Sequence, residues 1–436
     1  MKRSFVCAAG IVLALALIPV AGAQGAAGRG AAAAGRGARA GRNPFQRGPR
    51  IVSPQVNQDN TITMRFYAPQ AHTVVVQGEL DGKPHPMTKA ANGVWSVTVG
   101  PLAPDVYNYQ FLVDGIATLD PLDPAIKQGF GAFTSGSLVE VPEANGPAFD
   151  DAQNVPHGSV HIDTYYSSAI KAERVLYIYT PPGYATSTQS YPVFYLLHGA
   201  SGTASSWIFT GRENYIMDNL IAEGRAKPMI IVNPLVYPWQ GVGIATQRLQ
   251  DEQGGSPGGG GRRGGRATTG RGAAGRAGAA PAGARPGGIS PANDLFMQDL
   301  LNDAIPYVEK NYRTLNDPDH QALGGLSMGG GATIRVGFTH TNLFHTLVMM
   351  SPATPGNAAQ AYPAFFQDPA ATNSTLKLVW LGMGSDDTLV GPGVKVLNTT
   401  LTDQKIDHEW WTFPGGRHEW VVWRHALEVV APQMFK

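Results

Sequence analysis

A serine stands at the centre of the pentapeptide Gly325-Leu326-Ser327-Met328-Gly329. A serine hydroxyl is a weak nucleophile unless a histidine takes its proton and a carboxylate orients that histidine. In a nucleophile elbow such a serine occupies a strained turn between a strand and a helix, and the flanking glycines allow both elements to approach. A chain with 54 glycines also contains this pattern by chance, so the partners of the serine decide its meaning.

Candidate partners follow in the second half of the chain. Asp386-Asp387 comes after the apolar run 376–383, and His418 comes after the run 408–413. Hydrolases with a nucleophile elbow place their residues in the order Ser, Asp or Glu, His, each behind a strand. Taken singly, the aspartates could cap a helix and the histidine could be a surface residue. Because all three types occur in order, we predict that Ser327 is a nucleophile and His418 its base.

Backbone N–H groups must hold the negative charge that develops on an attacked carbonyl oxygen. We expect one donor at Met328, directly after the serine, and the other at Gly199 or Ala200, after the apolar run 193–197. His198 precedes these residues and is expected to support their loop, because it does not lie in the terminal loop where the base belongs. The chemistry implies no metal and no organic cofactor.

Strand and helix patterns alternate around these positions. Continuous apolar runs suit strands buried on both faces of a sheet, and further runs occur at 175–180 and 229–232. Helical spacing appears at 213–223 and 295–312. The alternation predicts an α/β fold with a largely parallel sheet and helices on both sides, which brings the catalytic loops to the carboxyl ends of the strands.

The region before this domain has another pattern. Between residues 46 and 143, short segments with alternating polarity predict a small β-sandwich, and Asp114-Gly115 predicts a hairpin turn. Trp95 and Tyr109 are candidates for stacking on sugar rings, with the sandwich core as the ordinary alternative. We assign the α/β domain to 155–436, with a disordered Gly/Arg/Ala/Pro-rich insertion at 252–289.

The catalytic region resembles the esterase-D-type α/β-hydrolases, and within them the feruloyl esterases of carbohydrate esterase family 1. The matching segments are 179–184, 196–199, 218–224, 230–232, 299–301, 305–307, 325–331, 384–389 and 415–423. The resemblance implies that Asp387, not Asp386, is the triad acid, because Thr388-Leu389 follows it as in the family. The region 46–143 resembles the early-set immunoglobulin-like modules next to glycogen- and xylan-active enzymes, at segments 66–69, 93–95, 107–111 and 113–115. The insertion departs from the family pattern and leaves the choice of substrate open.

The resemblance implies a serine esterase that acts on feruloyl or acetyl esters of plant polysaccharide. Trp207, Trp239 and Trp420 are expected to line an acyl or sugar pocket, and burial in the core is the alternative for each. Three other functions stay open: an enterochelin-type siderophore esterase, an acyltransferase on the same fold, and a non-catalytic carbohydrate-binding protein.

The N-terminus and the composition bear on location. Lys2-Arg3, an apolar segment and Ala21-Gly22-Ala23 predict a signal peptide over residues 1–23, cleaved near Ala23. The only cysteine, Cys7, falls inside it, and an Ala/Gly/Arg-rich disordered linker follows at 24–45. A net charge of +1 gives no general attraction to nucleic acid or to an acidic membrane. We therefore expect a secreted or periplasmic enzyme without disulfides, not bound to a membrane after cleavage; its oligomeric state does not follow from the sequence.

Overall fold

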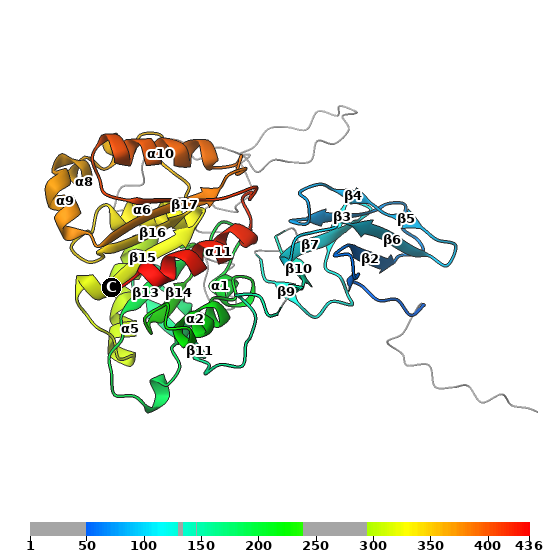
Figure 1. The fold of residues 1–436 in the computed structure, drawn as a ribbon, viewed down its shortest axis with the longest axis horizontal. Helices are drawn as coiled ribbons and strands as arrows, with labels where there is room; N and C mark the ends of the chain where they lie inside the picture. The colour runs from blue at the N-terminus through cyan, green and yellow to red at the C-terminus, as the bar shows by residue number, and fades with distance from the viewer. Residues whose placement is uncertain (1–48, 130–133, 145, 239–293) are drawn as a thin grey trace, which may run out of the picture. The chain divides into compact units, whose positions relative to one another are not determined.

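The computed structural model describes residues 49–129, 134–144, 146–238 and 294–436 (Figure 1). The predicted signal peptide, the linker and the insertion at 252–289 lie outside these residues. Among the described helices, none combines the length and apolar character that a membrane crossing requires.

The first folded part is a β-sandwich of two antiparallel sheets. One sheet has the order β1 (Gln55–Val56), β2 (Ile62–Tyr67), β6 (Val94–Val99), β5 (Thr88–Lys89). The other has the order β4 (His85–Pro86), β3 (Val74–Gly78), β7 (Asp105–Val113), β10 (Gly136–Val141), β9 (Ile126–Lys127), and β8 (Ile116–Thr118) pairs with β7. The β7–β8 hairpin turns at Asp114-Gly115 as predicted, with positive φ at both residues.

Two aromatic residues of the sandwich face its core. Trp95 is 6% exposed and donates its indole N–H to the Ala68 carbonyl. Tyr109 is fully buried, and its hydroxyl donates to Asp120 and Asp123. Both rings therefore belong to the sandwich core, the ordinary alternative to sugar stacking, because neither presents a face to solvent.

The second part is an eight-stranded sheet. Its order is β11 (Ser159–Ser167), β12 (Ala172–Thr180), β14 (Ile230–Pro234), β13 (Val193–Leu197), β15 (Gln321–Leu326), β16 (Thr346–Met350), β17 (Leu378–Gly384), β18 (Glu409–Phe413). Strands β13 to β18 are parallel, whereas β11 and β12 add an antiparallel edge. The largely parallel sheet is as predicted.

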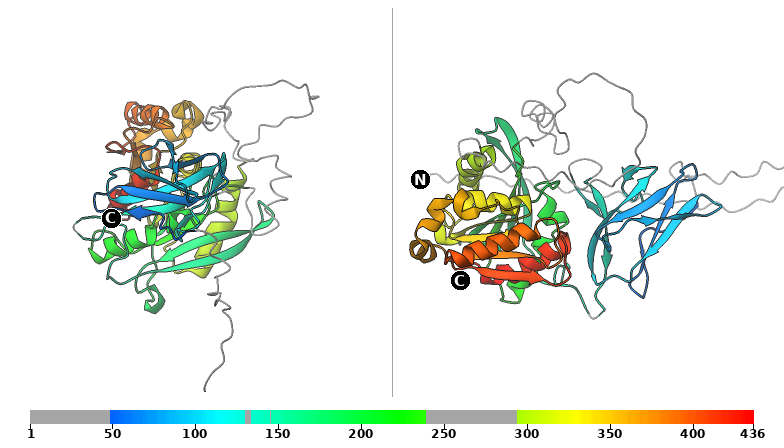
Figure 2. Two further views of the ribbon diagram at one scale, coloured as in Figure 1. Left: turned by 90° about the vertical axis from the view of Figure 1, so that its right-hand side faces the viewer. Right: turned by 90° about the horizontal axis from the view of Figure 1, so that it is seen from above.

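Helices cover both faces of this sheet (Figures 1 and 2). One face packs against α4 (Leu295–Asp299), α5 (Ile305–Asn311), α6 (Met328–Gly337), α8 (Pro363–Gln367) and α10 (Gly391–Asp403). The other packs against α1 (Ser206–Phe209), α2 (Glu213–Ala222) and α11 (Trp420–Val430). The short helices α7 (Ala358–Ala361) and α9 (Pro369–Thr375) flank α8. The helix predicted at 295–312 is present, with a π-helical segment, Leu300–Ala304, between α4 and α5.

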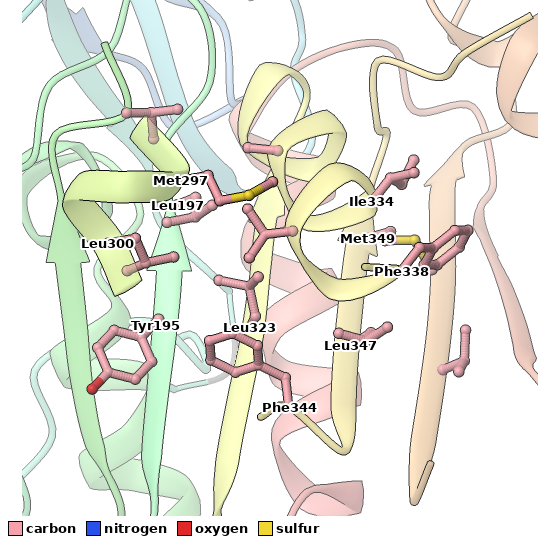
Figure 3. Close-up of a cluster of buried hydrophobic side chains, with 14 of the residues drawn as sticks. Tyr195, Leu197, Met297, Leu300, Leu323, Ile334, Phe338, Phe344, Leu347 and Met349 are labelled. Carbon is pink, nitrogen blue, oxygen red and sulfur yellow. The ribbon is translucent and has the colours of Figure 1, made fainter. Parts of the chain in front are cut away.

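The buried side chains between sheet and helices interdigitate (Figure 3). Tyr195, Leu323 and Leu347 come from three adjacent strands and are fully buried. Leu300 and Phe338 cover them from the helical side. A central strand buried on both faces reads as one apolar run, which is why β13 was visible in the sequence.

Candidate active site

Ser327 lies at the sharp turn from β15 into α6. Its backbone angles are φ 52° and ψ −113°, a strained conformation for a residue with a side chain. A Cβ at Gly325 would lie 2.7 Å from the Leu197 carbonyl, and a Cβ at Gly329 would lie 2.6 Å from the His198 carbonyl. The two glycines therefore let the turn pack directly against the end of β13, as the pentapeptide predicted.

The loops after β17 and β18 bring two side chains to this serine. His418 Nε2 lies 2.9 Å from Ser327 Oγ, and His418 Nδ1 lies 2.7 Å from Asp387 Oδ2. In the catalytic arrangement, Nδ1–H donates to the carboxylate and Nε2 accepts the hydroxyl proton. The three residues predicted from their order thus form one hydrogen-bonded chain, although 91 positions separate the serine from the histidine.

The two adjacent aspartates have different environments. Asp387 is 4% exposed, and its Oδ1 accepts the backbone N–H groups of Leu389 and Val390, each at 3.0 Å. Burial alone would raise the pKa of Asp387, but the His418 ring and these N–H donors outweigh it and hold the pKa below its ordinary value. Asp386 is exposed and accepts only the hydroxyl of Ser385 among its side-chain contacts in the described residues. Asp387 is therefore the carboxylate that reaches the histidine.

Backbone donors lie beside the serine. Met328 is the first residue of α6, and the first N–H groups of a helix have no partner within it. A Cβ at Gly199 would lie 3.2 Å from Ser327 Cβ, so the loop that contains Gly199 and Ala200 passes directly along the serine. The predicted oxyanion donors are thus on the two segments that flank Ser327.

His198 stabilises the loop that contains Gly199 and Ala200. Its Nδ1 donates to the Gly199 carbonyl at 2.8 Å, and its Nε2 accepts the Val236 N–H at 3.0 Å. Burial lowers the pKa of His198 to about 4, so the ring is neutral at physiological pH. With both ring nitrogens engaged, His198 supports the loop, as expected.

Arg174 also stabilises this loop, through Tyr237, and it was not among the residues predicted from the sequence. The guanidinium is fully buried, donates to Asp299, and donates to the carbonyls of Leu235 and Tyr237 at 2.5 and 2.7 Å. The Tyr237 hydroxyl in turn accepts the N–H of Ser201 at 2.8 Å. The only signal in the sequence was a charged residue at the start of a buried apolar run.

The two predicted tryptophans within the described residues are buried in the core and do not line a pocket. Trp207 is fully buried, donates its N–H to the Leu197 carbonyl and packs edge-on against Trp420, whose side chain is also buried. Both belong to the core between the sheet and α11, which corrects the expectation of substrate contact. Trp239 lies outside the described residues.

A cavity of about 260 Å³ opens beside His418 instead. Its lining combines residues after β17 and β18 with residues of the sandwich: Thr388, Leu389, Arg417, His418, Glu419, Gly78, Glu79 and Gly82. Leu389 is 65% exposed, so the cavity has an apolar rim next to polar groups. Among the described residues, no group of three or more His, Asp or Glu side chains is arranged to hold a metal ion.

Comparisons with known proteins match both parts of the chain. A family model described as "Putative esterase" matches residues 167–238 and 276–434. The model for carbohydrate-binding module 48, the isoamylase N-terminal domain, matches residues 52–125. An endo-1,4-beta-xylanase/feruloyl esterase from Xylanibacter ruminicola is 27% identical over 389 residues, which are 88% of this chain and 46% of that protein. The chain thus spans about half the length of this relative.

Solved structures of an enterobactin esterase share the fold. The enterobactin esterase from Shigella flexneri superposes with a TM-score of 0.58 at 16% identity, over 85% of this chain and 92% of that one. A family CE1 ferulic acid esterase from Anaeromyces mucronatus has a TM-score of 0.46 at 21% identity, over 68% of this chain and 98% of that one. The two family models and the match to the enterobactin esterase confirm the predicted α/β-hydrolase class and the immunoglobulin-like module before it.

Proposed function

The chain belongs to the Esterase family, and from this premise we propose that it is a serine carboxylic-ester hydrolase with Ser327, His418 and Asp387 as its triad. One observation carries the proposal. An unbroken chain of hydrogen bonds runs from Asp387 through His418 to Ser327, which stands on a strained strand-to-helix turn. Each member alone has a structural explanation, whereas the three together have the geometry of an activated nucleophile.

The proposed reaction proceeds through an acyl-enzyme. Ser327 Oγ attacks the ester carbonyl carbon while His418 Nε2 takes the hydroxyl proton, and Asp387 stabilises the imidazolium that forms. The N–H groups of Met328 and of Gly199 or Ala200 hold the oxyanion; loss of one such donor raises the barrier by about 3 kcal/mol. His418 then protonates the departing alkoxide, and water, activated by the same histidine, releases the acid.

We propose feruloyl or acetyl esters of plant polysaccharide as the substrates. The relative from Xylanibacter ruminicola is named a xylanase/feruloyl esterase, and the N-terminal part matches a carbohydrate-binding module.

The test compares esters on the wild-type protein and on Ser327→Ala. The wild type should hydrolyse 4-nitrophenyl acetate and methyl ferulate, and the variant should lose both activities and labelling by a fluorophosphonate. A wild type that neither turns over esters nor takes the label would refute the mechanism and favour a binding protein. A wild type that prefers a catecholate trilactone to methyl ferulate would be a siderophore esterase. Transfer of the acyl group from Ser327 to a sugar hydroxyl, in place of water, would identify an acyltransferase.

We also propose that the protein is exported. Lys2-Arg3, the apolar segment and Ala21-Gly22-Ala23 support cleavage near Ala23. Mass spectrometry of the protein from the periplasm or medium should find an N-terminus close to Gln24. Recovery of the uncleaved chain in the cytoplasm would refute export.

A further inference from the structure

The loop that carries His418 is held from two sides. We call residues 414–419, between β18 and α11, the base loop. On one side it packs against the loop after β17: the Gly415 N–H donates to Ser385 Oγ at 2.8 Å, and the Asp386 N–H donates to the Gly416 carbonyl at 2.9 Å. This side of the base loop is therefore held by the α/β domain itself.

The other side is held by a residue of the β-sandwich. Arg417 Nη2 donates to the backbone carbonyl of Glu79 at 2.7 Å. The N–H of Trp420, the first residue of α11, points to Glu79 Oε1 at 3.4 Å. Glu79 follows β3 directly, so a single sandwich residue contacts the chain on both sides of His418.

Arg417 is itself held in one arrangement. Glu419 Oε2 accepts from Arg417 Nη2 at 2.9 Å and from Nε at 3.3 Å, while Glu419 Oε1 accepts the Arg417 N–H at 3.1 Å. Gly82 lies against the guanidinium, because a Cβ there would be 2.7 Å from Nη1. An arginine with these contacts keeps its planar group in a defined orientation.

Glu79 has little freedom as well. Its N–H donates to the Asn108 carbonyl at 2.8 Å, and its Oε2 accepts the Asn108 N–H at 3.1 Å. Asn108 belongs to β7, a central strand of its sheet. Burial raises the pKa of Glu79, against the opposing effects of Lys127 and Arg424. The support of the base loop thus reaches a paired strand, not a free loop.

We propose that Glu79, Arg417 and Glu419 are positioning residues that hold His418 in line with Ser327 and Asp387, so that the sandwich is part of the catalytic apparatus. The proposal rests on the triad proposed above. His418 must keep contacts of 2.7 and 2.9 Å at its two nitrogens, and a catalytic group displaced by a fraction of an ångström loses much of its effect. None of the three positioning residues need touch the reacting atoms.

The test uses the 4-nitrophenyl and methyl esters of ferulic acid on full-length variants. A nitrophenolate leaves without a proton, whereas a methoxide must receive one from His418, so a displaced histidine harms the methyl ester more. We expect Arg417→Ala to lower kcat/KM by about 10-fold on the aryl ester and about 100-fold on the methyl ester. Arg417→Lys keeps a cationic donor but loses the planar fork. Its ratio of kcat/KM on the aryl ester to kcat/KM on the methyl ester should lie between those of Arg417→Ala and the wild type.

A second variant disturbs the same contact from the sandwich side. Gly82→Ala places a methyl group against Arg417 Nη1, and it should shift the ratio of the two rates in the same direction. Gly115→Ala is its matched control, since Gly115 has φ +82° against +76° for Gly82, and a Cβ at Gly115 would meet no atom within 4 Å. This control should leave the ratio unchanged, as should Arg225→Ala, which removes a surface ion pair with Glu223 and Glu428.

Titration of active serines with a fluorophosphonate normalises every rate. A ratio that stays at the wild-type value in Arg417→Ala and Gly82→Ala overturns the proposal, whether the rates are unchanged or fall together with the titrated fraction. An active wild type with an unaltered ratio in both variants rejects the positioning role alone. An inactive wild type rejects the triad, and the positioning role with it.

Discussion

At the scale of residues, two neighbouring carboxylates illustrate how environment decides a role. Asp386 and Asp387 follow the same strand, but only Asp387 is buried, accepts two backbone N–H groups and reaches His418. Its lowered pKa keeps it ionised across the neutral pH range, which is the state that fixes the histidine tautomer.

Paired substitutions test this difference. Asp387→Asn should lower kcat by on the order of 10³- to 10⁴-fold, because an amide that donates to Nδ1 imposes the wrong tautomer. Asp386→Asn, the adjacent control, should change kcat by less than about twofold, since the side chain is exposed, its amide oxygen can still accept from Ser385, and the backbone N–H to Gly416 is unchanged. Steady-state hydrolysis of 4-nitrophenyl acetate measures both; equal losses in the two variants would contradict the assignment.

At the scale of elements, helix α2 begins with a buried acid, Glu213. Glu213 Oε2 accepts from Asn233 Nδ2 at 3.0 Å, and the same amide donates to the Leu196 carbonyl at 3.2 Å. Glu213 thereby ties α2 to the ends of β13 and β14. Burial raises the pKa of Glu213 to about 8, so the side chain is mostly protonated at neutral pH.

This pKa predicts how stability depends on pH. The folded protein keeps the Glu213 proton up to about pH 8, whereas the unfolded chain loses it near 4.5, so rising pH favours unfolding between these values. From pH 6 to pH 9 the contribution of Glu213 to the free energy of unfolding should fall by on the order of 2 kcal/mol. Glu213→Gln should remove this decrease in urea unfolding, while Glu223→Gln, an exposed acid directly after the same helix, should retain it.

At the scale of the whole molecule, a buried ionic cluster joins the sandwich to α11. Arg424 of α11 is fully buried and donates to Asp105 and to the Val106 carbonyl of β7. Arg424 Nε also lies 3.1 Å from Asp150 Oδ2, in the segment that connects β10 of the sandwich to β11 of the eight-stranded sheet. Burial alone would raise the pKa of Asp105, but Arg424 and His425 outweigh it and lower the pKa. The sandwich and α11 are thus connected by a buried arginine that stabilises the charges of two buried aspartates.

Removal of the central cation should therefore be costly. Arg424→Ala leaves Asp105 and Asp150 buried with only their longer ion-pair contacts to His425 and Arg212, and the free energy of unfolding should fall by about 3–5 kcal/mol. Arg225→Ala, which breaks exposed pairs, should cost at most about 1 kcal/mol. Urea denaturation of both variants measures the difference; similar midpoints would show that the cluster contributes little.

Much of the architecture was predictable from local patterns. Apolar runs predicted β13 and β17, helical spacing predicted α2, and the order of Ser327, Asp387 and His418 matched their meeting at the carboxyl ends of strands. The antiparallel edge strand β11 was not predicted, because only Tyr165 and Ser167 of its residues are buried and polar residues interrupt any continuous apolar run. Trp207 and Trp420 were assigned to a pocket because residue type alone does not distinguish an aromatic core from an aromatic site.

Local sequence patterns predicted the chemistry that we propose: a serine between glycines, followed by a carboxylate and a histidine that each come after a strand. Those signals are local, since each consists of residue types within one short segment of the chain. The folded structure was needed to show that Trp207 and Trp420 are buried, and that Glu79, 338 positions before Arg417, contacts the base loop. Contacts of that kind arise when separately folded sheets pack together, and no local pattern records which side chains will meet.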